Sequence, residues 1–213
     1  MKSISRIKAI LIFALSITFL SVSAQKQKGI GIFDGFGDVG DPKLVGNIKY
    51  DASTRTYTIT AGGINVWGTF DQFFYAWKNV KGNFSLTAKV SFEGAGVDPH
   101  RKIGIMLRET LTAGSRCAHI SIHGDGLTSL QYRSQTDGIT REIVGPKDGD
   151  YIILEKVGKK IRMKTATGTL PHEVTGEIEM EFPKKFFIGI YASSRNVDVL
   201  ETAYFTNVEF KKL

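Results

Sequence analysis

The sequence contains a single cysteine, Cys117, among its 213 residues. One cysteine cannot form an intramolecular disulfide, so a fold held together by disulfide bonds is excluded. A catalytic thiol would need a histidine close in space, and His119 lies two positions further along the same predicted strand. Side chains two apart on a strand point in parallel rather than toward each other. We therefore interpret Cys117 as a small buried hydrophobic residue.

Helical patterns are also missing after the first 25 residues. No segment there combines a sustained apolar period of 3.6 residues with capping residues, and no low-complexity tract or internal repeat is present. Short runs with a period of two predict half-buried β-strands instead. Without helices to cover parallel crossovers, these strands are expected to form two stacked antiparallel sheets in one domain. The predicted strands are Thr56–Thr60, Phe73–Trp77, Phe84–Phe92, Ile103–Arg108, Cys117–His123, Leu127–Arg133, Tyr151–Val157, Lys160–Lys164, Phe186–Ala192 and Ala203–Phe210.

The sequence also lacks the spacing of histidines and cysteines that is typical of metal sites. The chain has no His-x-His or Cys-His pattern of the kind that binds zinc. His119 and His123 are four residues apart on a predicted strand, which separates them by about 13 Å, too far to share one ion. His100 and His172 each follow a proline in a predicted loop. We therefore predict no metal site from the histidines.

A structural calcium ion is the one cofactor that the sequence suggests as an alternative. Asp34, Asp38 and Asp41 occur within one glycine-rich stretch, and calcium prefers several oxygen ligands on a flexible loop. Their spacing matches no EF-hand, and aspartate beside glycine is also ordinary turn chemistry.

The first 24 residues are predicted to be a cleaved signal peptide. Lys2, Arg6 and Lys8 form a cationic start, Ala9–Leu20 is apolar, and Val22–Ala24 supplies the small residues of a cleavage site. The apolar run is shorter than the about 20 residues of a membrane helix. No cysteine directly follows the cleavage position to carry a lipid anchor, although an uncleaved anchor is an alternative. The mature chain, residues 25–213, is therefore predicted to be secreted or periplasmic, without a membrane span.

Charge is spread along the mature chain. The sequence carries 28 Lys+Arg and 21 Asp+Glu, and the leader holds three of the basic residues and none of the acidic ones, so the net charge falls from +7 to +4. Basic pairs such as Lys159-Lys160 fall at predicted strand ends, where they keep edges from pairing. A nucleic-acid-binding surface would cluster them on one face. We predict no nucleic-acid partner, and the sequence leaves the oligomeric state open.

Several motifs stand out along most of the mature chain, namely Asp38–Pro42, Tyr50-Asp51, Ala61–Trp67, Asp71–Trp77, Gly82–Phe84, His100–Arg108, His123–Arg133 and Phe205–Val208. They resemble an uncharacterised bacterial family of the concanavalin A-like lectin/glucanase superfamily, the domain of unknown function 1349 type. The resemblance implies an all-β, jelly-roll sandwich of two curved antiparallel sheets. It brings no agreed catalytic residues, and members of the superfamily bind or cleave glycans, so fold alone does not settle function.

The segment from His119 to Arg133, HISIHGDGLTSLQYR, is the most informative part of the chain. Two alternating runs flank a Gly-Asp-Gly break, which predicts a β-hairpin. Its polar side chains share one face, and Ile120 and Leu130 share the other. We expect the polar face to be exposed and, with aromatic residues that stack on sugar rings, to bind a poly- or oligosaccharide without cleaving it. The predicted ligand-binding residues are Trp67, Asp71, Tyr75, Trp77, Arg108, His119, His123, Gln131 and Arg133.

Two alternatives to glycan binding remain at this point. A glycoside hydrolase or polysaccharide lyase would need an acid and a base that converge. The lyase candidates are His123 or Tyr132 with Gln131 and Arg108, and the glucanase candidates are Glu177, Glu179 and Glu181, which resemble the catalytic strand of retaining glucanases. The other alternative is a protein-interaction module of the cell envelope, which a large exposed apolar patch would favour.

Overall fold

The computed structural model describes residues 29–213, so the predicted signal peptide lies outside the described residues. The described part consists of fifteen β-strands and no helix. One sheet contains β1 (Gly35–Val39), β4 (Asn65–Trp67), β5 (Phe70–Val80), β7 (Lys102–Arg108), β8 (Cys117–His123), β9 (Thr128–Arg133), β10 (Arg141–Val144) and β14 (Phe186–Ser193). The other contains β2 (Asn47–Asp51), β3 (Thr56–Ala61), β6 (Phe84–Phe92), β11 (Tyr151–Val157), β12 (Lys160–Ala166), β13 (Gly176–Glu179) and β15 (Glu201–Lys212).

The two sheets form an all-β jelly-roll sandwich, as predicted. The eight-stranded sheet has the order β1-β5-β14-β7-β8-β9-β10, with β4 also paired to β5. The seven-stranded sheet has the order β13-β12-β11-β6-β15-β3-β2, and all strand pairs in both sheets are antiparallel. Within residues 29–213, no helix has the length and apolar character needed to cross a membrane. All ten predicted strands are present, and the short β1, β2, β4, β10 and β13 are additional.

The main hydrophobic core lies between the sheets. It is built from the alternating apolar residues that the sequence pattern places on one face of each strand, among them Ile59, Leu86, Ile120, Leu130 and Phe205. Each is at most 1% exposed. Because complete burial of such a side chain stabilises the fold by about 1.5–3 kcal/mol, this layer supplies the main driving force for folding.

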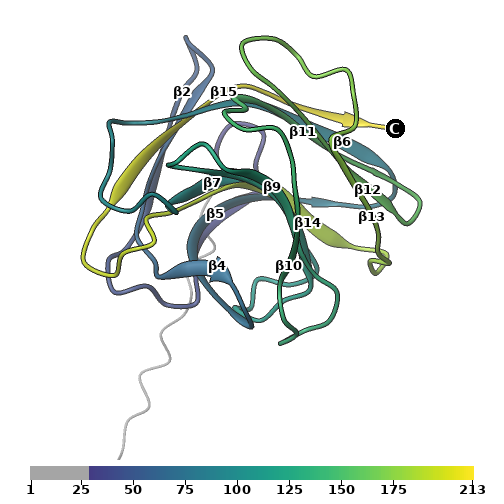
Figure 1. The fold of residues 1–213 in the computed structure, drawn as a ribbon, viewed down its shortest axis with the longest axis horizontal. Helices are drawn as coiled ribbons and strands as arrows, with labels where there is room; N and C mark the ends of the chain where they lie inside the picture. Colours follow the sequence, from purple (N-terminus) through teal and green to yellow (C-terminus); the bar gives the residue numbers. More distant parts are fainter. Residues whose placement is uncertain (1–28) are drawn as a thin grey trace, which may run out of the picture.

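A second hydrophobic cluster covers the other face of the eight-stranded sheet. Val39, Val66, Phe73, Tyr75, Met106 and Tyr191 form it. Figure 1 shows β4 on the side of this sheet that faces away from the seven-stranded sheet. All seven residues of β7 and all seven of β8 are therefore buried, on both faces of the sheet. The prediction that one face of this sheet is open to solvent is wrong.

The hairpin predicted from His119 to Arg133 is present, with β8 and β9 as its strands. His119 pairs with Gln131, and Ile120 pairs with Leu130 in the core layer. Gly126 has a φ of 82°, which the reversal needs and which a residue with a side chain rarely adopts. The predicted side-chain directions therefore hold, and Tyr132 packs against the core. Only the surroundings of the polar face differ from the expectation.

Candidate functional site

Three of the predicted sugar-binding residues form a buried ion-pair cluster instead. Asp71 on β5 accepts hydrogen bonds from both terminal guanidinium nitrogens of Arg133, at 2.9 and 2.8 Å, and one from Arg108 at 2.8 Å. All three side chains are fully buried. Burial by itself lowers the pKa of Arg133, but the hydrogen bonds and charge of Asp71 outweigh it and raise the pKa. These side chains are closed to a ligand, which corrects their prediction as ligand-binding residues.

The same guanidinium groups hold three loops across the sheet. Arg108 donates to the carbonyls of Thr110 and Thr112, in the loop between β7 and β8. Arg133 donates to the carbonyl of Gly138 beyond β9 and to that of Gly68 in the β4–β5 turn. Satisfying buried donors in this way is what permits a charged residue in the interior. The loops therefore cover the face that the sequence predicted to be open.

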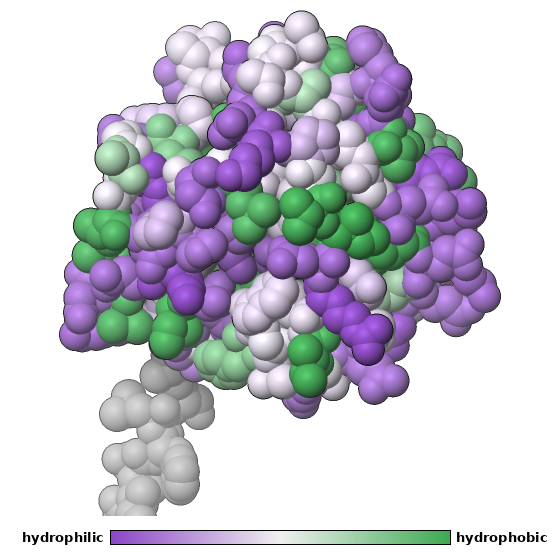
Figure 2. All heavy atoms as spheres, viewed as in Figure 1, coloured by the Kyte–Doolittle hydropathy of each residue, from purple (hydrophilic) through white to green (hydrophobic). Residues whose placement is uncertain are grey.

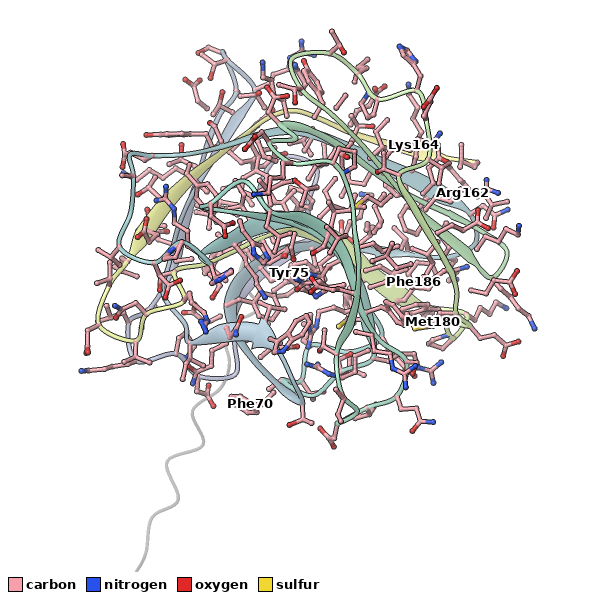
Figure 3. All side chains as sticks on the ribbon, viewed as in Figure 1. Phe70, Tyr75, Arg162, Lys164, Met180 and Phe186 are labelled. Atoms are coloured by element: carbon pink, nitrogen blue, oxygen red, sulfur yellow. The ribbon has the colours of Figure 1, made fainter. Side chains whose placement is uncertain are left out.

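His119 and Tyr75 are also interior residues. His119 Nδ1 lies 3.0 Å from both Ser121 Oγ and Tyr191 Oη, and Tyr75 donates a 2.8 Å hydrogen bond to the Met106 carbonyl. Burial lowers the pKa of His119 well below its usual value, so the ring is neutral. Figure 3 shows Tyr75 inside the curve of the sheet, whereas Phe70 extends outward beside β4. The prediction that His119 and Tyr75 bind a ligand from solvent is wrong.

Trp77 lies apart from the remaining candidates. Its ring packs between Tyr75 and Phe187, with ring centroids 5.9 and 6.4 Å away, and is partly buried against the second cluster. A Cβ on Gly35 would come within 2.8 Å of the indole, so the backbone of β1 also lies against it. This position identifies Trp77 as a packing residue, in contrast to the stacking platform that was predicted.

One pocket remains at the end of the covered face, where β4, β7, β8, β9 and β10 meet. It has a volume of about 210 Å³. Trp67, His123 and Gln131, which the sequence analysis selected, line it. Asn65, His100, Lys102, Leu127, Glu142 and Arg195 complete the lining and were not predicted.

Lys102 and Gln131 organise the floor of this pocket. The Lys102 ammonium donates to the Val66 carbonyl at 2.9 Å and to Gln131 Oε1 at 3.2 Å, and it lies 5.3 Å from the centroid of the Trp67 ring. Burial, with a contribution from Arg195, lowers the pKa of Lys102 to about 8. The Gln131 amide nitrogen lies 3.3 Å from Glu142 Oε2 and donates to it. The floor therefore presents fixed polar groups beside one aromatic ring.

His123 connects the floor to the rim. Its Nε2 lies 3.3 Å from the Gln131 amide nitrogen, and its Nδ1 lies 3.3 Å from Nδ1 of His100. Burial lowers the pKa of His123 to about 3, and the nearby positive charge of Lys102 adds to the effect. The imidazole is consequently neutral at pH 7. Sequence spacing missed this pair because His100 precedes β7, and only the pairing of Lys102 with His123 brings it alongside.

The residues proposed for lyase or glucanase chemistry assemble only in part: His123 and Gln131 line the pocket, and the other candidates lie elsewhere. Arg108 is held by Asp71, and Tyr132 packs against the core. Glu177, on the edge strand β13, pairs with Lys160 and Arg162 on the outer surface. Figure 3 shows Arg162, the ion-pair partner of Glu177, far from Tyr75, which lies inside the covered sheet face. Glu179 and Glu181 are likewise exposed, as expected for a solvated face.

The three aspartates considered for calcium make separate contacts. Asp34 accepts hydrogen bonds from Asn79, and Asp38 accepts them from the amide of Gly46. Among residues 29–213, Asp34, Asp38 and Asp41 do not form a group whose ligand atoms all lie within 4.8 Å of one another. A structural calcium ion at these residues has not been tested and stays a prediction.

The outer surface is mixed in character. On the face shown in Figure 2, hydrophobic residues form a short band that hydrophilic residues border on both sides. Such a mixture is ordinary for a solvated surface, because apolar atoms make up more than half of most protein surfaces. This face adds no support to the alternative of a protein-interaction module.

Comparison with known proteins places the fold but not the family. No family model and no curated protein matches the chain. A functionally unknown protein from Saccharomyces cerevisiae has a TM-score of 0.63 at 14% identity, over 83% of this chain and 96% of its own. The GH43 protein BlXynB from Bacillus licheniformis has a TM-score of 0.58 at 11% identity, over 84% of this chain but 39% of its own. The carbohydrate binding module CBM66 from Bacillus subtilis has a TM-score of 0.52 at 11% identity, over 82% and 97%.

These likenesses extend over most of the described structure at very low sequence identity. They show the architecture and do not transfer an activity. The resemblance to the uncharacterised bacterial family is therefore still a prediction. The chain has the concanavalin A-like β-sandwich fold.

Proposed function

We propose that the protein binds a poly- or oligosaccharide in the pocket at the end of the covered sheet face, without a chemical step. The observation that carries the proposal is the position of Trp67. Trp67 is 38% exposed and lines a pocket whose other walls are polar apart from Leu127. An indole face stacks on the apolar C–H face of a sugar ring, and polar groups around it bind the hydroxyls.

The polar groups suit a neutral or mildly anionic sugar. Asn65 and Gln131 offer planar amides, Glu142 accepts hydrogen bonds from hydroxyl groups, and Lys102 and Arg195 donate hydrogen bonds. The volume of about 210 Å³ is below the about 300–1,000 Å³ of most small-molecule sites. The pocket thus suits one sugar unit, such as the end of a chain, rather than the extended segment expected from an open sheet face.

The structural neighbours and the predicted leader agree with this proposal. The neighbours include a carbohydrate binding module of similar length. Polysaccharides occur mainly outside the cytoplasm, and residues 1–24 have the pattern of a signal peptide. We accordingly infer a secreted or periplasmic location. The lyase set is not proposed further, because its arginine is sequestered by Asp71.

Affinity gels and a glycan array would test the proposal with purified residues 25–213. On the glycan that retains the parent protein, Trp67→Ala should weaken binding about tenfold, because a central aromatic contact contributes more than about 1 kcal/mol to the free energy of binding. Phe70→Ala is the matched control: Phe70 pairs with Trp67 in the same hairpin and is 52% exposed, but it does not line the pocket. Equal behaviour of the two variants, or no retention on any glycan, would refute the proposal.

A further inference from the structure

A group of metal-ligand side chains lies at the rim of the pocket. His100, His123 and Asp125 each offer one ligand atom, and these atoms all lie within 4.8 Å of one another. The two Nδ1 atoms are 3.3 Å apart, and Asp125 Oδ2 is 3.9 Å from Nδ1 of His100. His100 precedes β7, His123 ends β8, and Asp125 lies in the turn between β8 and β9. Segments 23 residues apart in the sequence therefore converge on one point.

The backbone holds these segments against each other. The amide of Asp125 donates to the Pro99 carbonyl at 2.9 Å, and the amide of Gly124 donates to the Arg101 carbonyl at 3.1 Å. A Cβ at Gly124 would lie 3.0 Å from the Arg101 side chain and 3.1 Å from the Pro99 carbonyl, so this close approach favours glycine. The two ligand-bearing segments form a pre-organised unit.

The side chains are also oriented for a shared ion. Asp125 Oδ1 accepts a 3.0 Å hydrogen bond from the amide of Leu127, which leaves Oδ2 as the oxygen nearer to His100. The two imidazole planes are 85° apart. Zinc binds histidine nitrogen at about 2.0–2.1 Å in tetrahedral geometry, which separates two such nitrogens by about 3.3–3.4 Å. The observed 3.3 Å equals this separation and is long for an ordinary hydrogen bond.

The surrounding charges do not exclude a cation. Lys102 and Arg195 line the pocket, and Glu142 and Asp125 offset them. The Lys102 ammonium is already bound to the Val66 carbonyl and to Gln131 Oε1. An ion on Nδ1 of His123 would leave the proton on Nε2, beside the Gln131 amide. A turn of that amide would place its oxygen there as the acceptor that metal-bound histidines commonly have, and it would exchange the hydrogen bond from Lys102 to Gln131 Oε1 for this one.

We propose that His100, His123 and Asp125 bind a divalent late first-row transition metal, with zinc as the best fit to two nitrogens and one oxygen. Three protein ligands leave a fourth position for water. Because His100 and His123 both line the pocket, the ion is reachable from it. The proposal is independent of glycan binding, since the ligands assemble without a sugar.

Isothermal titration of the protein with zinc chloride tests this site directly. The protein should carry no polyhistidine tag and should first be dialysed against a chelator. One equivalent of zinc should bind with a Kd of about 10 µM or tighter. X-ray absorption of the zinc complex should show imidazole scattering together with oxygen ligands. No sugar is present, so failure here would leave the glycan proposal untouched.

Variants at exposed ligands identify the site without disturbing the core. His100→Ala and Asp125→Asn should each weaken zinc binding at least about tenfold, and His172→Ala, an exposed loop histidine elsewhere, should not change it. The thermal unfolding temperature of metal-free His100→Ala should equal that of the parent, and zinc should raise it only in the parent. Absence of stoichiometric zinc binding, or undiminished affinity in His100→Ala, would overturn the proposal.

Discussion

Replacing Asp71 by Asn should strongly destabilise the protein, although it preserves the shape of the side chain. The Asp71 carboxylate is fully buried and accepts three hydrogen bonds from two arginines. The amide of Asn carries no charge and presents only one oxygen. The change leaves Arg108 and Arg133 without a counter-charge in the interior and turns an N–H₂ group toward them.

The magnitude follows from the cost of an unpaired buried charge. Removing one partner of a buried ion pair costs about 3–5 kcal/mol, and here two guanidinium groups lose their partner. Domains of this kind are stable by about 5–15 kcal/mol, so a substantial share of the total is lost. With a urea dependence of about 2–3 kcal/mol/M, the unfolding midpoint should fall by about 1–2 M.

Urea denaturation followed by tryptophan fluorescence measures this loss. Glu177→Gln provides the control, because it removes two ion pairs on the surface that water and salt already screen, and its midpoint should match the parent. Asp71→Asn combined with Arg108→Met should be less destabilised than the sum of the single changes, because one uncompensated charge has been removed. An unchanged midpoint for Asp71→Asn would refute the account of the cluster as the group that closes the sheet face.

Two further predictions concern buried titratable groups. Burial lowers the pKa of His123 to about 3, so between the ordinary histidine pKa of about 6.5 and pH 3 the unfolded chain binds a proton that the native state does not. His123 should therefore contribute a fall in stability of about 1.4 kcal/mol per pH unit as the pH drops through this range in metal-free buffer. His119, whose pKa burial also lowers, adds to this slope, so His123→Gln should reduce the slope by about that amount and not abolish it; a parent stability that is constant from pH 6.5 to 4 contradicts this. Burial also raises the pKa of the Cys117 thiol to about 11, so a thiol reagent at pH 8 should label it only after unfolding, and rapid labelling of the native protein would contradict the buried position.

Much of the fold was predictable because alternation is a local property. The directions of Ile120 and Leu130 toward the core, and of His119 and Gln131 away from it, follow from the period of two along each strand. The short strands were harder to predict. β4 has three residues, and its pairing with β5 rather than its own pattern defines it.

The candidate site was only partly predictable. Trp67, His123 and Gln131 were all selected from the sequence and line one pocket, and the ligand-binding role assigned to them is still a proposal. Lys102 lies in a strand that was predicted from Ile103 onward, and Arg195 follows a strand at some distance in the sequence. Neither residue lies in a sequence pattern that would predict its position beside the β8–β9 hairpin.

The sequence by itself determined the class of fold and the face on which each strand residue lies, because steric alternation along an extended chain needs no information from distant segments. Only the tertiary structure decided what covers that face. A strand with arginine and histidine on one side predicts exposure, since isolated charges are rarely buried. Asp71 reverses this outcome, because a paired and hydrogen-bonded charge is stable in the interior, and the sequence does not reveal the pairing before the chain has folded.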